Sequence, residues 1–384
     1  MIRREITDLL RVYASEFRAI LLVGPRQSGK TTLVKQVFKE KQYVSLENPD
    51  ERYIAESDPR AFLKRFPNGA ILDEIQRAPS LLNYLQEILD TTEEDGLFIL
   101  TGSNNVLLQE SITQSLAGRI GVLDLYPLGF NELPEELHQL NLNHFIFRGS
   151  YPEVIVKKRN PTLWYNSYIK TYIERDVKQL KNIENTLLFI KFVKLCAGRI
   201  GQQLNSTSLS NECGIDVKTV NAWLSVLEAT YIIKLITPYY KNFNKRLVKT
   251  PNLYFVDTGL ACSLLGIRKE EELVNSHFRG ALVENFLIME TFKKSVNSGV
   301  GDALYYWRDN KGLEIDLLIE NEKGEMLPIE IKSSQTYSNK FSDNISKFCE
   351  FADVKKGIVI YDGVVEFVSS DNIQVQSWKT FLKQ

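Results

Sequence analysis

Short apolar runs alternate with helix-like patterns over the first third of the chain. The runs that read as buried strands are ILLV (20–23), YVSL (43–46), AILDE (70–74) and LFILTGS (97–103). Helical patterns lie at residues 30–40 and 80–90. Strands that alternate with helices are typical of a mostly parallel sheet with helices on both faces. We therefore predict the α/β fold class, with a three-layer parallel-sheet domain over residues 1–130.

The strand signals fade after about residue 130, where helix formers and aromatic residues dominate. Trp164, Tyr168 and Tyr172 recur every four residues, which places them on one face of an amphipathic helix. We interpret this face as core packing, and residues 131–182 as a helical lid or connector.

A helix-turn-helix pattern follows in TSLSNECGIDVKTVNAWLSVLEA, residues 207–229. Ser208 is predicted to cap a short helix, Gly214 to form the tight turn, and Asp216 to cap a second helix. The second helix would turn Val220, Leu224 and Leu227 inward. Two strand-like runs then flank a basic loop, so we predict a winged helix over residues 183–265.

The last segment, residues 266–384, places four charged side chains inside apolar patterns. Glu284 lies in the helical run GALVENFLIMETF, Asp316 in GLEIDLLI, and Glu330 and Lys332 in LPIEIK. Alternation with a period of two puts Glu330 and Lys332 on one face of their strand. One interpretation is the solvated face of an ordinary hairpin. The other is a site, because an unpaired carboxylate among Ile and Leu side chains is costly.

Residues 24–31 read GPRQSGKT, between an apolar strand and a helical pattern. This is the GxxxxGK[ST] phosphate loop in its expected context. Lys30 would lie between the β- and γ-phosphates of a nucleotide, and Thr31 would supply a hydroxyl to Mg²⁺. The residues predicted to bind the nucleotide are Gly24, Pro25, Arg26, Gln27, Ser28, Gly29, Lys30, Thr31 and Thr32.

Two carboxylates end the predicted strand at 70–74, where a hydrolytic site would need them. Asp73 would hold Mg²⁺ through water, and Glu74 would act as general base toward the attacking water. At the end of the next strand, Thr101, Ser103 or Asn104 could orient the γ-phosphate or that water, although a loop-capping role is an open alternative for each.

Several motifs in a fixed order make the chain resemble a known family. The segments are GPRQSGKTTL, YVSLENP, ILDEIQ, ILTGSNN, LAGRI, YPLGFNEL and GSYPEV, followed by LYFVDTGLACSLLG and ALVENF. They resemble the bacterial and archaeal AAA+-type ATPases that carry a C-terminal domain of unknown function. The resemblance implies ATP as the nucleotide, hydrolysis coupled to domain motion, and a homo-oligomer.

Phosphoryl transfer usually also needs an arginine that neutralises charge in the transition state. Candidates in family-like segments are Arg119, Arg148 and Arg175. Arg119 is the first choice, and contact from a neighbouring subunit is an open alternative.

The tail also resembles the PD-(D/E)xK nuclease arrangement, in which a helical acid precedes an Asp and then a (D/E)xK strand. In that arrangement Asp316 and Glu330 would chelate a divalent metal, with Glu284 completing the set and Lys332 positioning water. A domain of this fold can also bind nucleic acid or a partner without cutting.

Composition bounds these interpretations. A chain of 384 residues with net charge −1 is long enough for two or three domains and has no overall affinity for polyanions. Residues 181–256 differ, with ten Lys or Arg against four Asp or Glu. Predicted DNA contacts in this basic stretch are Lys218, Lys241, Lys245, Arg246 and Lys249.

Cys196, Cys213, Cys262 and Cys349 lie far apart without a CxxC pair, which predicts reduced cysteines. Neither a secretory signal nor an apolar run of ~18 residues is present, so we expect a cytoplasmic protein with no membrane span.

Three functions remain open from the sequence. The leading one is an ATP-hydrolysing AAA+-type protein that acts on or binds DNA through a winged helix and a nuclease-like domain. The alternatives are a nucleotide-gated regulatory or adaptor protein that binds a protein partner, and an ATP-dependent endonuclease on branched or foreign DNA.

Overall fold

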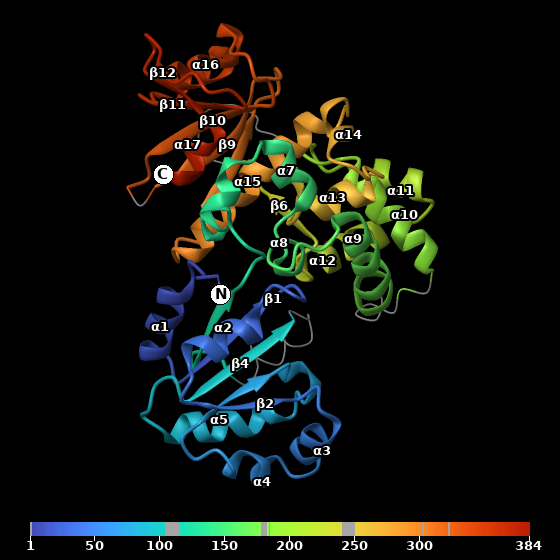
Figure 1. Ribbon diagram of the computed structural model, residues 1–384, viewed down its shortest axis with the longest axis vertical. Coiled ribbons are helices and arrows are strands. Elements are labelled where there is room, and N and C mark those ends of the chain that lie inside the picture. Colours follow the sequence, from blue (N-terminus) through green and yellow to red (C-terminus); the bar gives the residue numbers. More distant parts are fainter. Residues whose placement is uncertain are drawn as a thin grey trace.

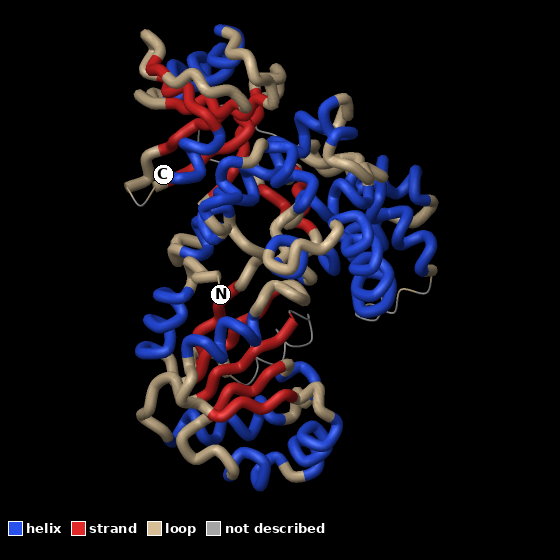
Figure 2. Tube along the Cα trace, viewed as in Figure 1, coloured by secondary structure: helices blue, strands red, loops and turns tan. Residues whose placement is uncertain are grey.

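The computed structural model describes residues 2–103, 116–177 (backbone only for 174–177), 183, 185–239, 250–301, 303–321 and 323–384. These residues form three parts (Figure 1, Figure 2). An N-terminal sheet domain lies at one end of the long axis, a C-terminal sheet at the other, and mainly helical segments lie between and beside them. No described helix has the length and apolar character needed to cross a membrane.

The N-terminal sheet has the strand order β2-β3-β4-β1-β5, and every neighbouring pair is parallel. Its strands are β1 (Ala19–Gly24), β2 (Gln42–Ser45), β3 (Ala70–Asp73), β4 (Phe98–Ser103) and β5 (Ile120–Asp124). The predicted parallel α/β sheet is therefore confirmed. The sequence pattern did not predict β5, whose short run contains Gly121 and the exposed Val122.

Helices cover both faces of this sheet. They are α1 (Thr7–Glu16), α2 (Lys30–Val37), α3 (Pro49–Ser57), α4 (Pro59–Lys64) and α5 (Leu81–Thr91), with a 3₁₀ turn η1 (Ile75–Arg77). Alternate residues of β1 point to opposite faces. Ile20 and Leu22 pack with α1 and α2, whereas Leu21 and Val23 belong to the core that α3, α4 and α5 cover.

The connector contains short helices and a helical segment with widened, π-type turns. Its elements are η2 (Phe130–Glu132), η3 (Glu135–Gln139), α7 (Leu142–Arg148), α8 (Pro152–Ile155), α9 (Pro161–Tyr168) and the π segment η4 (Ile169–Val177). Trp164 stacks on Tyr168 at 5.1 Å between ring centroids, and Tyr168 packs on Tyr172 at 5.1 Å. The predicted aromatic packing face is confirmed.

The next part, here called the α10–β7 unit, contains three helices and a two-stranded antiparallel sheet. Its elements are α10 (Thr186–Ala197), α11 (Ser206–Cys213), α12 (Val217–Ala229), β6 (Ile233–Ile236) and β7 (Asn252–Phe255). Gly214 forms the turn at φ +78°, and Asp216 caps α12 by accepting the Thr219 N–H at 2.9 Å. Val220, Leu224 and Leu227 are buried as predicted.

The predicted cap of α11 was wrong. Asn205, not Ser208, is the N-cap, because its Oδ1 accepts the backbone N–H of Ser208 at 2.9 Å. An N-cap side chain accepts from a backbone N–H two or three residues further on, so Ser208 lies inside the first turn.

Two short helices, α13 (Thr258–Leu264) and α14 (Glu271–Val274), lead into the C-terminal part. Its sheet has the order β12-β13-β11-β10-β9-β8, with β8, β9 and β10 antiparallel and β10, β11 and β13 parallel. The elements are α15 (Arg279–Asn297), β8 (Leu304–Arg308), β9 (Glu314–Glu320), β10 (Met326–Lys332), η5 (Asn339–Ser342), α16 (Asp343–Ala352), β11 (Gly357–Tyr361), β12 (Phe367–Val368), β13 (Ile373–Ser377) and α17 (Trp378–Lys383).

Candidate functional site

The phosphate loop runs from the end of β1 into the first turn of α2, as the motif predicts. Gly24 has φ +151°, and a Cβ there would clash with the carbonyl oxygen of Leu125, so only glycine fits. Gly29 has φ +98°. Around the loop Pro25, Ser28 and Lys30 are buried, whereas Gln27 and Thr32 are exposed.

Lys30 is held by the loop itself. Its Nζ donates to the carbonyl oxygens of Gly24 and Pro25, at 2.9 Å each. Burial lowers the pKa of Lys30 to about 8, although Glu74 and Asp73 favour its charged form. The ammonium thus lies where the loop closes, with two weak acceptors that stronger phosphate oxygens could replace.

Asp73 is the centre of a hydrogen-bond cluster beside the loop. Thr31 Oγ1 lies 3.1 Å from each Asp73 carboxylate oxygen, and the Tyr43 hydroxyl donates to Oδ2 at 2.7 Å. Thr101 also donates to Asp73, and its Oγ1 accepts the Glu74 N–H at 3.3 Å. The hydroxyl of Thr31 therefore lies beside the carboxylate of Asp73, and the cluster joins α2, β2, β3 and β4.

Glu74 follows Asp73 in the left-handed region, at φ +58°. Burial raises the pKa of its carboxyl, and Lys30 and a hydrogen bond from Gln76 partly oppose the shift. Gln76 also donates to Ser103 Oγ at 3.0 Å. A buried carboxyl with a raised pKa is suited to accept a proton near neutral pH.

Mg²⁺ and nucleotide phosphates fit these residues. The Ser28 hydroxyl is buried without a hydrogen-bond partner, so the loop contains a polar group that needs one. The hydroxyl of Thr31 and the carboxylate of Asp73 are hard oxygen donors of the kind that Mg²⁺ prefers.

Arg4 contacts the phosphate loop, a feature that the sequence did not reveal. Its guanidinium donates to the Ser28 carbonyl in the loop at 2.9 Å, to the Tyr126 carbonyl at 2.7 Å, and to the buried Glu132 carboxylate at 2.9 Å. Because it lies twenty positions before the first residue of the loop and carries no motif, nothing in its local sequence predicts this contact.

Of the candidate arginines, Arg119 does not lie at the phosphate loop. Ile120 pairs with Ala19, the first residue of β1, so Arg119 lies at the amino-terminal ends of the strands. Gly24 is the last residue of β1, five residues further along the strand, which corresponds to a distance of about 17 Å. It is paired there with Asp90. Contact of Arg119 with the nucleotide of its own subunit is therefore excluded in this conformation. Arg148 donates to the Val154 carbonyl at 2.8 Å, and the side chain of Arg175 lies outside the described residues.

The four charged residues of the tail form one cluster, here called the acidic cluster: Glu284, Asp316, Glu330 and Lys332. Lys332 Nζ lies 2.5 Å from Glu330 Oε1 and 4.0 Å from Asp316 Oδ2. The β9–β10 ladder ends at Leu317 and Ile329, and beyond it Asp316 accepts the Ile331 N–H at 2.7 Å. Tyr254 donates to Glu284 Oε1 at 2.7 Å.

The charge of Asp316 affects both other carboxyls of the acidic cluster. Burial raises the pKa of Asp316, and burial followed by the Asp316 charge raises the pKa of Glu284 well above its ordinary range. The pKa of Glu330 rises to about 8 for the same two reasons. Glu330 Oε2 is buried and has no hydrogen-bond partner. A wet hairpin face does not have these properties, so that interpretation is wrong.

The cluster fits a divalent metal only in part. Among the described residues, no group of three or more His, Cys, Asp or Glu side chains is arranged to hold an ion. Asp316 and Glu330 offer two hard carboxylates, and one oxygen of Glu330 is free to accept a ligand.

A chain of buried contacts connects the phosphate loop with α15. Glu132, which holds Arg4, also accepts the Gly129 N–H at 2.8 Å. The next residue, Phe130, donates its N–H to Glu290 Oε2 at 2.5 Å, and Lys293 donates to Glu290 Oε1 at 2.8 Å. Glu290 and Lys293 are on α15, the helix that also carries Glu284.

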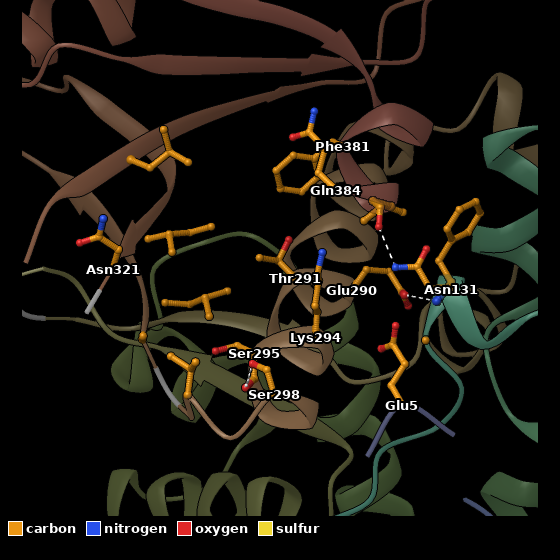
Figure 3. A pocket seen from close by; sticks show the side chains of 18 of the residues that line it. Glu5, Asn131, Glu290, Thr291, Lys294, Ser295, Ser298, Asn321, Phe381 and Gln384 are labelled. Atoms are coloured by element: carbon orange, nitrogen blue, oxygen red, sulfur yellow. Dashed lines mark hydrogen bonds between the residues drawn. The ribbon is translucent and has the colours of Figure 1, made fainter. Parts of the chain in front are cut away.

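A cavity of about 410 Å³ lies beside this chain of contacts. In Figure 3 Glu290 and Lys294 of α15 lie between Glu5 of the N-terminal segment and two residues at the C-terminal end, Phe381 of α17 and Gln384. This cavity shows that α15 does not pack tightly against the N-terminal segment over the full length of the helix.

Of the predicted DNA contacts, only Lys218 lies within the described residues, exposed near the start of α12. Lys241, Lys245, Arg246 and Lys249 fall outside them. All four cysteines are free, and Cys196, Cys213 and Cys262 are buried.

Three family profiles match successive parts of the chain. An AAA domain matches residues 16–134, a domain of unknown function (DUF8612) matches residues 139–271, and a second one (DUF4143) matches residues 279–381. An uncharacterized protein of Mycobacterium tuberculosis is 28% identical over 376 residues, which cover 97% of this chain and 82% of that protein. An uncharacterized protein of Haemophilus influenzae is 22% identical, with 98% and 97% covered.

Among solved structures, the Walker-type ATPase of Pyrococcus abyssi is similar at TM-score 0.47 and 15% identity, covering 69% of this chain and 96% of that one. AMPPCP-bound DnaA of Aquifex aeolicus is similar at TM-score 0.28 and 14% identity, covering 58% and 85%. The AAA profile and the loop geometry agree: residues 16–134 are similar to an AAA-type P-loop ATPase domain.

Proposed function

We propose that the protein binds ATP with Mg²⁺ at the phosphate loop and hydrolyses it to control a C-terminal half that acts on DNA. Lys30 would transfer its hydrogen bonds from the Gly24 and Pro25 carbonyls to the phosphates, at the point where charge develops. Bound Mg²⁺ would supply positive charge to the phosphate oxygens. Thr31 and Asp73 are the residues that would hold it.

Glu74 is the proposed general base. Its burial and its hydrogen bond to Gln76 fix the carboxyl beside Lys30 and Asp73, and the backbone contact with Thr101 fixes the residue's left-handed turn. Glu74→Gln keeps the shape but cannot take a proton. We expect it to retain ATP binding and to lower turnover by about 10²-fold or more.

Lys30→Ala supplies the matching test of binding. It should abolish ATP turnover in a coupled phosphate-release assay, and Lys39→Ala, an exposed lysine beyond α2, is the control. Turnover at the wild-type rate in Lys30→Ala would show that the loop is not the nucleotide site.

Arg119 is proposed to act from a neighbouring subunit of a homo-oligomer. Its position at the amino-terminal ends of the strands rules out contact with the nucleotide of its own subunit but allows contact with the nucleotide of another subunit. Mixing Arg119→Ala with Lys30→Ala subunits tests this, because mixed assemblies would recover turnover only at interfaces that combine an intact loop with an intact arginine. Purely additive rates would contradict it.

The single observation that carries the DNA proposal is the convergence of the acidic cluster in its setting. The order α15-β8-β9-β10-α16-β11, with an antiparallel meander followed by a parallel strand, matches the order expected for a PD-(D/E)xK fold. The α10–β7 unit, with Lys218 on α12 and a basic sequence between β6 and β7, supports a winged helix as the DNA-binding part.

Binding and cleavage need separate tests. Fluorescence anisotropy with random duplex DNA should show affinity that falls steeply with added salt, because Lys and Arg contacts release counterions. No binding at low salt would contradict the DNA proposal. With Mg²⁺ or Mn²⁺, cleavage of plasmid or branched DNA that Lys332→Ala abolishes would make the protein an ATP-dependent endonuclease.

A nucleotide-gated adaptor is the second candidate, and one observation favours it. Lys332 pairs with Glu330 at 2.5 Å and lies 4.0 Å from Asp316, so the cation of the site is already supplied by the chain. Such a site would stabilise the fold without chemistry. DNA-independent binding of a protein partner, changed by ATP, would distinguish this function.

A further inference from the structure

Tyr43 lies on β2, the strand next to the one that carries Asp73. The parallel ladder pairs Ser45 with Asp73, and Tyr43 precedes Ser45 by two residues, so both side chains leave the same face of the sheet. This is the face that α2 covers, because Tyr43 packs against the apolar core that contains Leu33 and Val34 of α2. From there the Tyr43 hydroxyl reaches the Asp73 carboxylate.

Helix α2 also holds the ring of Tyr43 in place. The ammonium of Lys35 lies 3.3 Å from the ring centroid, which is a cation–π contact. Lys35 follows Thr31 by four residues, so both side chains lie on one face of α2. Tyr43 is therefore fixed between the helix that carries Thr31 and the strand that carries Asp73. Burial and the hydrogen bond to Asp73 raise the pKa of Tyr43, so its hydroxyl remains a donor at neutral pH.

Three hydroxyl groups converge on the Asp73 carboxylate, and their contacts differ. Tyr43 donates to Oδ2 at 2.7 Å, the usual length of such a bond, and Thr101 donates to Oδ1. Thr31 Oγ1 lies 3.1 Å from both oxygens, and its single proton can serve only one of them at a time. The strong contacts of Tyr43 and Thr101 thus fix one carboxylate oxygen each, whereas the contact of Thr31 is longer and shared.

The orientation of Asp73 matters for Thr31. A hydroxyl that donates its proton to a carboxylate keeps its oxygen lone pairs for another partner. With Asp73 fixed, the Thr31 oxygen can face Mg²⁺ while its proton points to the carboxylate. Hydrogen bonds from outer residues orient the groups that hold a metal, and their loss typically weakens metal binding about 10- to 100-fold.

We propose that Tyr43 is a positioning residue of the nucleotide site, whose hydroxyl fixes the Asp73 carboxylate in the orientation that Mg²⁺–ATP requires. This inference rests on the nucleotide and Mg²⁺ site of the proposed function, and it adds a residue of β2 to that site. Tyr43 acts through Asp73 and not on the nucleotide itself. Loss of the hydroxyl should therefore raise the Mg²⁺ requirement without weakening nucleotide binding in the absence of Mg²⁺.

Binding of a mant-labelled, non-hydrolysable ATP analogue to the full chain tests the proposal. Fluorescence is titrated with Mg²⁺ in wild type, in Tyr43→Phe, and in Asp73→Asn, which defines the Mg²⁺-dependent part, and nucleotide affinity is also measured in EDTA. Tyr84→Phe is the matched control. Tyr84 is half-buried in the same domain, has Arg60 5.9 Å from its ring centroid, and lies beside Phe98 at the amino end of β4. Melting temperatures without nucleotide verify that each variant folds.

We expect Tyr43→Phe to raise the Mg²⁺ concentration for half-maximal binding about 10-fold or more and to leave the Kd in EDTA near wild type. Tyr84→Phe should match wild type in both measurements. An unchanged Mg²⁺ requirement in Tyr43→Phe would overturn the positioning role, and so would an equal loss of affinity with and without Mg²⁺, which indicates packing alone. Absence of Mg²⁺-dependent nucleotide binding in wild type would instead overturn the proposed nucleotide site, and this inference with it.

Discussion

At the scale of single residues, the charge of Lys30 depends on what the phosphate loop contains. Burial sets its pKa to about 8, so above that pH the amine is mostly neutral. The negative phosphates of ATP favour the ammonium form and raise the pKa again. We predict proton uptake when ATP binds at pH 8.5, measured by calorimetry in two buffers of different ionisation enthalpy.

The same titration has a stability consequence. Because the pKa of Lys30 is lower in the folded state, the unfolded chain binds more protons between about pH 8 and 10.5, and this group makes stability rise with pH there. In the calorimetry experiment, proton uptake on ATP binding that is unchanged in Lys30→Met would show that another group takes up the proton.

For Glu330 the stability contribution changes with pH in the opposite direction. Its pKa is raised from 4.5 to about 8, so the protonated form stabilises the fold below about pH 4.5 and that contribution disappears as the pH rises through 8. Glu330→Gln should therefore raise the free energy of unfolding at pH 8.5 by roughly 0.5–2 kcal/mol, and by less at pH 5.

Urea denaturation at the two pH values measures this difference. Glu325→Gln, an exposed glutamate at the turn before β10, is the control. A destabilised Glu330→Gln at pH 8.5 would mean that the ion pair with Lys332 outweighs burial of the carboxylate.

At the scale of elements, the start of α11 separates two candidate caps. Asn205→Ala removes the side chain that accepts the Ser208 N–H, and we expect a loss of about 1 kcal/mol. Ser208→Ala removes a bond to Glu212 and a longer one from Arg199 but no acceptor for a backbone N–H, so it should cost less. Denaturation midpoints of the two variants check the order, and the reverse order would contradict the assignment of the cap.

Elements with a strong local pattern could be predicted from the sequence, and those fixed by distant packing could not. The phosphate loop, Asp73 and the face shared by Glu330 and Lys332 follow from motif and periodicity. Strand β5 does not, because Gly121 is small to admit the rings of Tyr13 and Phe17. The anchoring of the loop by Arg4 and the bond from Tyr254 to Glu284 depend on pairs that are 24 and 30 residues apart.

At the scale of the whole molecule, the contacts from Arg4 through Glu132 to Glu290 join the nucleotide loop to α15. If they transmit nucleotide binding, ATP and DNA must change each other's affinity by the same factor. Glu132→Gln keeps the shape of the side chain but weakens the ion pair with Arg4. We predict that it weakens the effect of ATP on DNA affinity and the effect of DNA on ATP affinity. The first is measured by DNA anisotropy with and without ATP analogue, and the second by nucleotide titration with and without DNA.

Glu136→Gln, an exposed glutamate just beyond the same segment, is the control for that experiment. A Glu132→Gln protein with both factors unchanged would exclude this route between the sites.

The chain between β6 and the basic stretch also protects the outer strand of the C-terminal sheet. Pro238 bridges to Tyr306, the Tyr239 N–H donates to the Tyr306 carbonyl at 2.8 Å, and the Tyr306 N–H donates to the Thr237 carbonyl at 3.2 Å. These bonds occupy the free side of β8, where an unpaired strand would be a template for association with other chains. A ligand that pulled residues 237–239 away from β8 would expose that edge. DNA binding and self-association of the protein would then be linked through the backbone of these three residues.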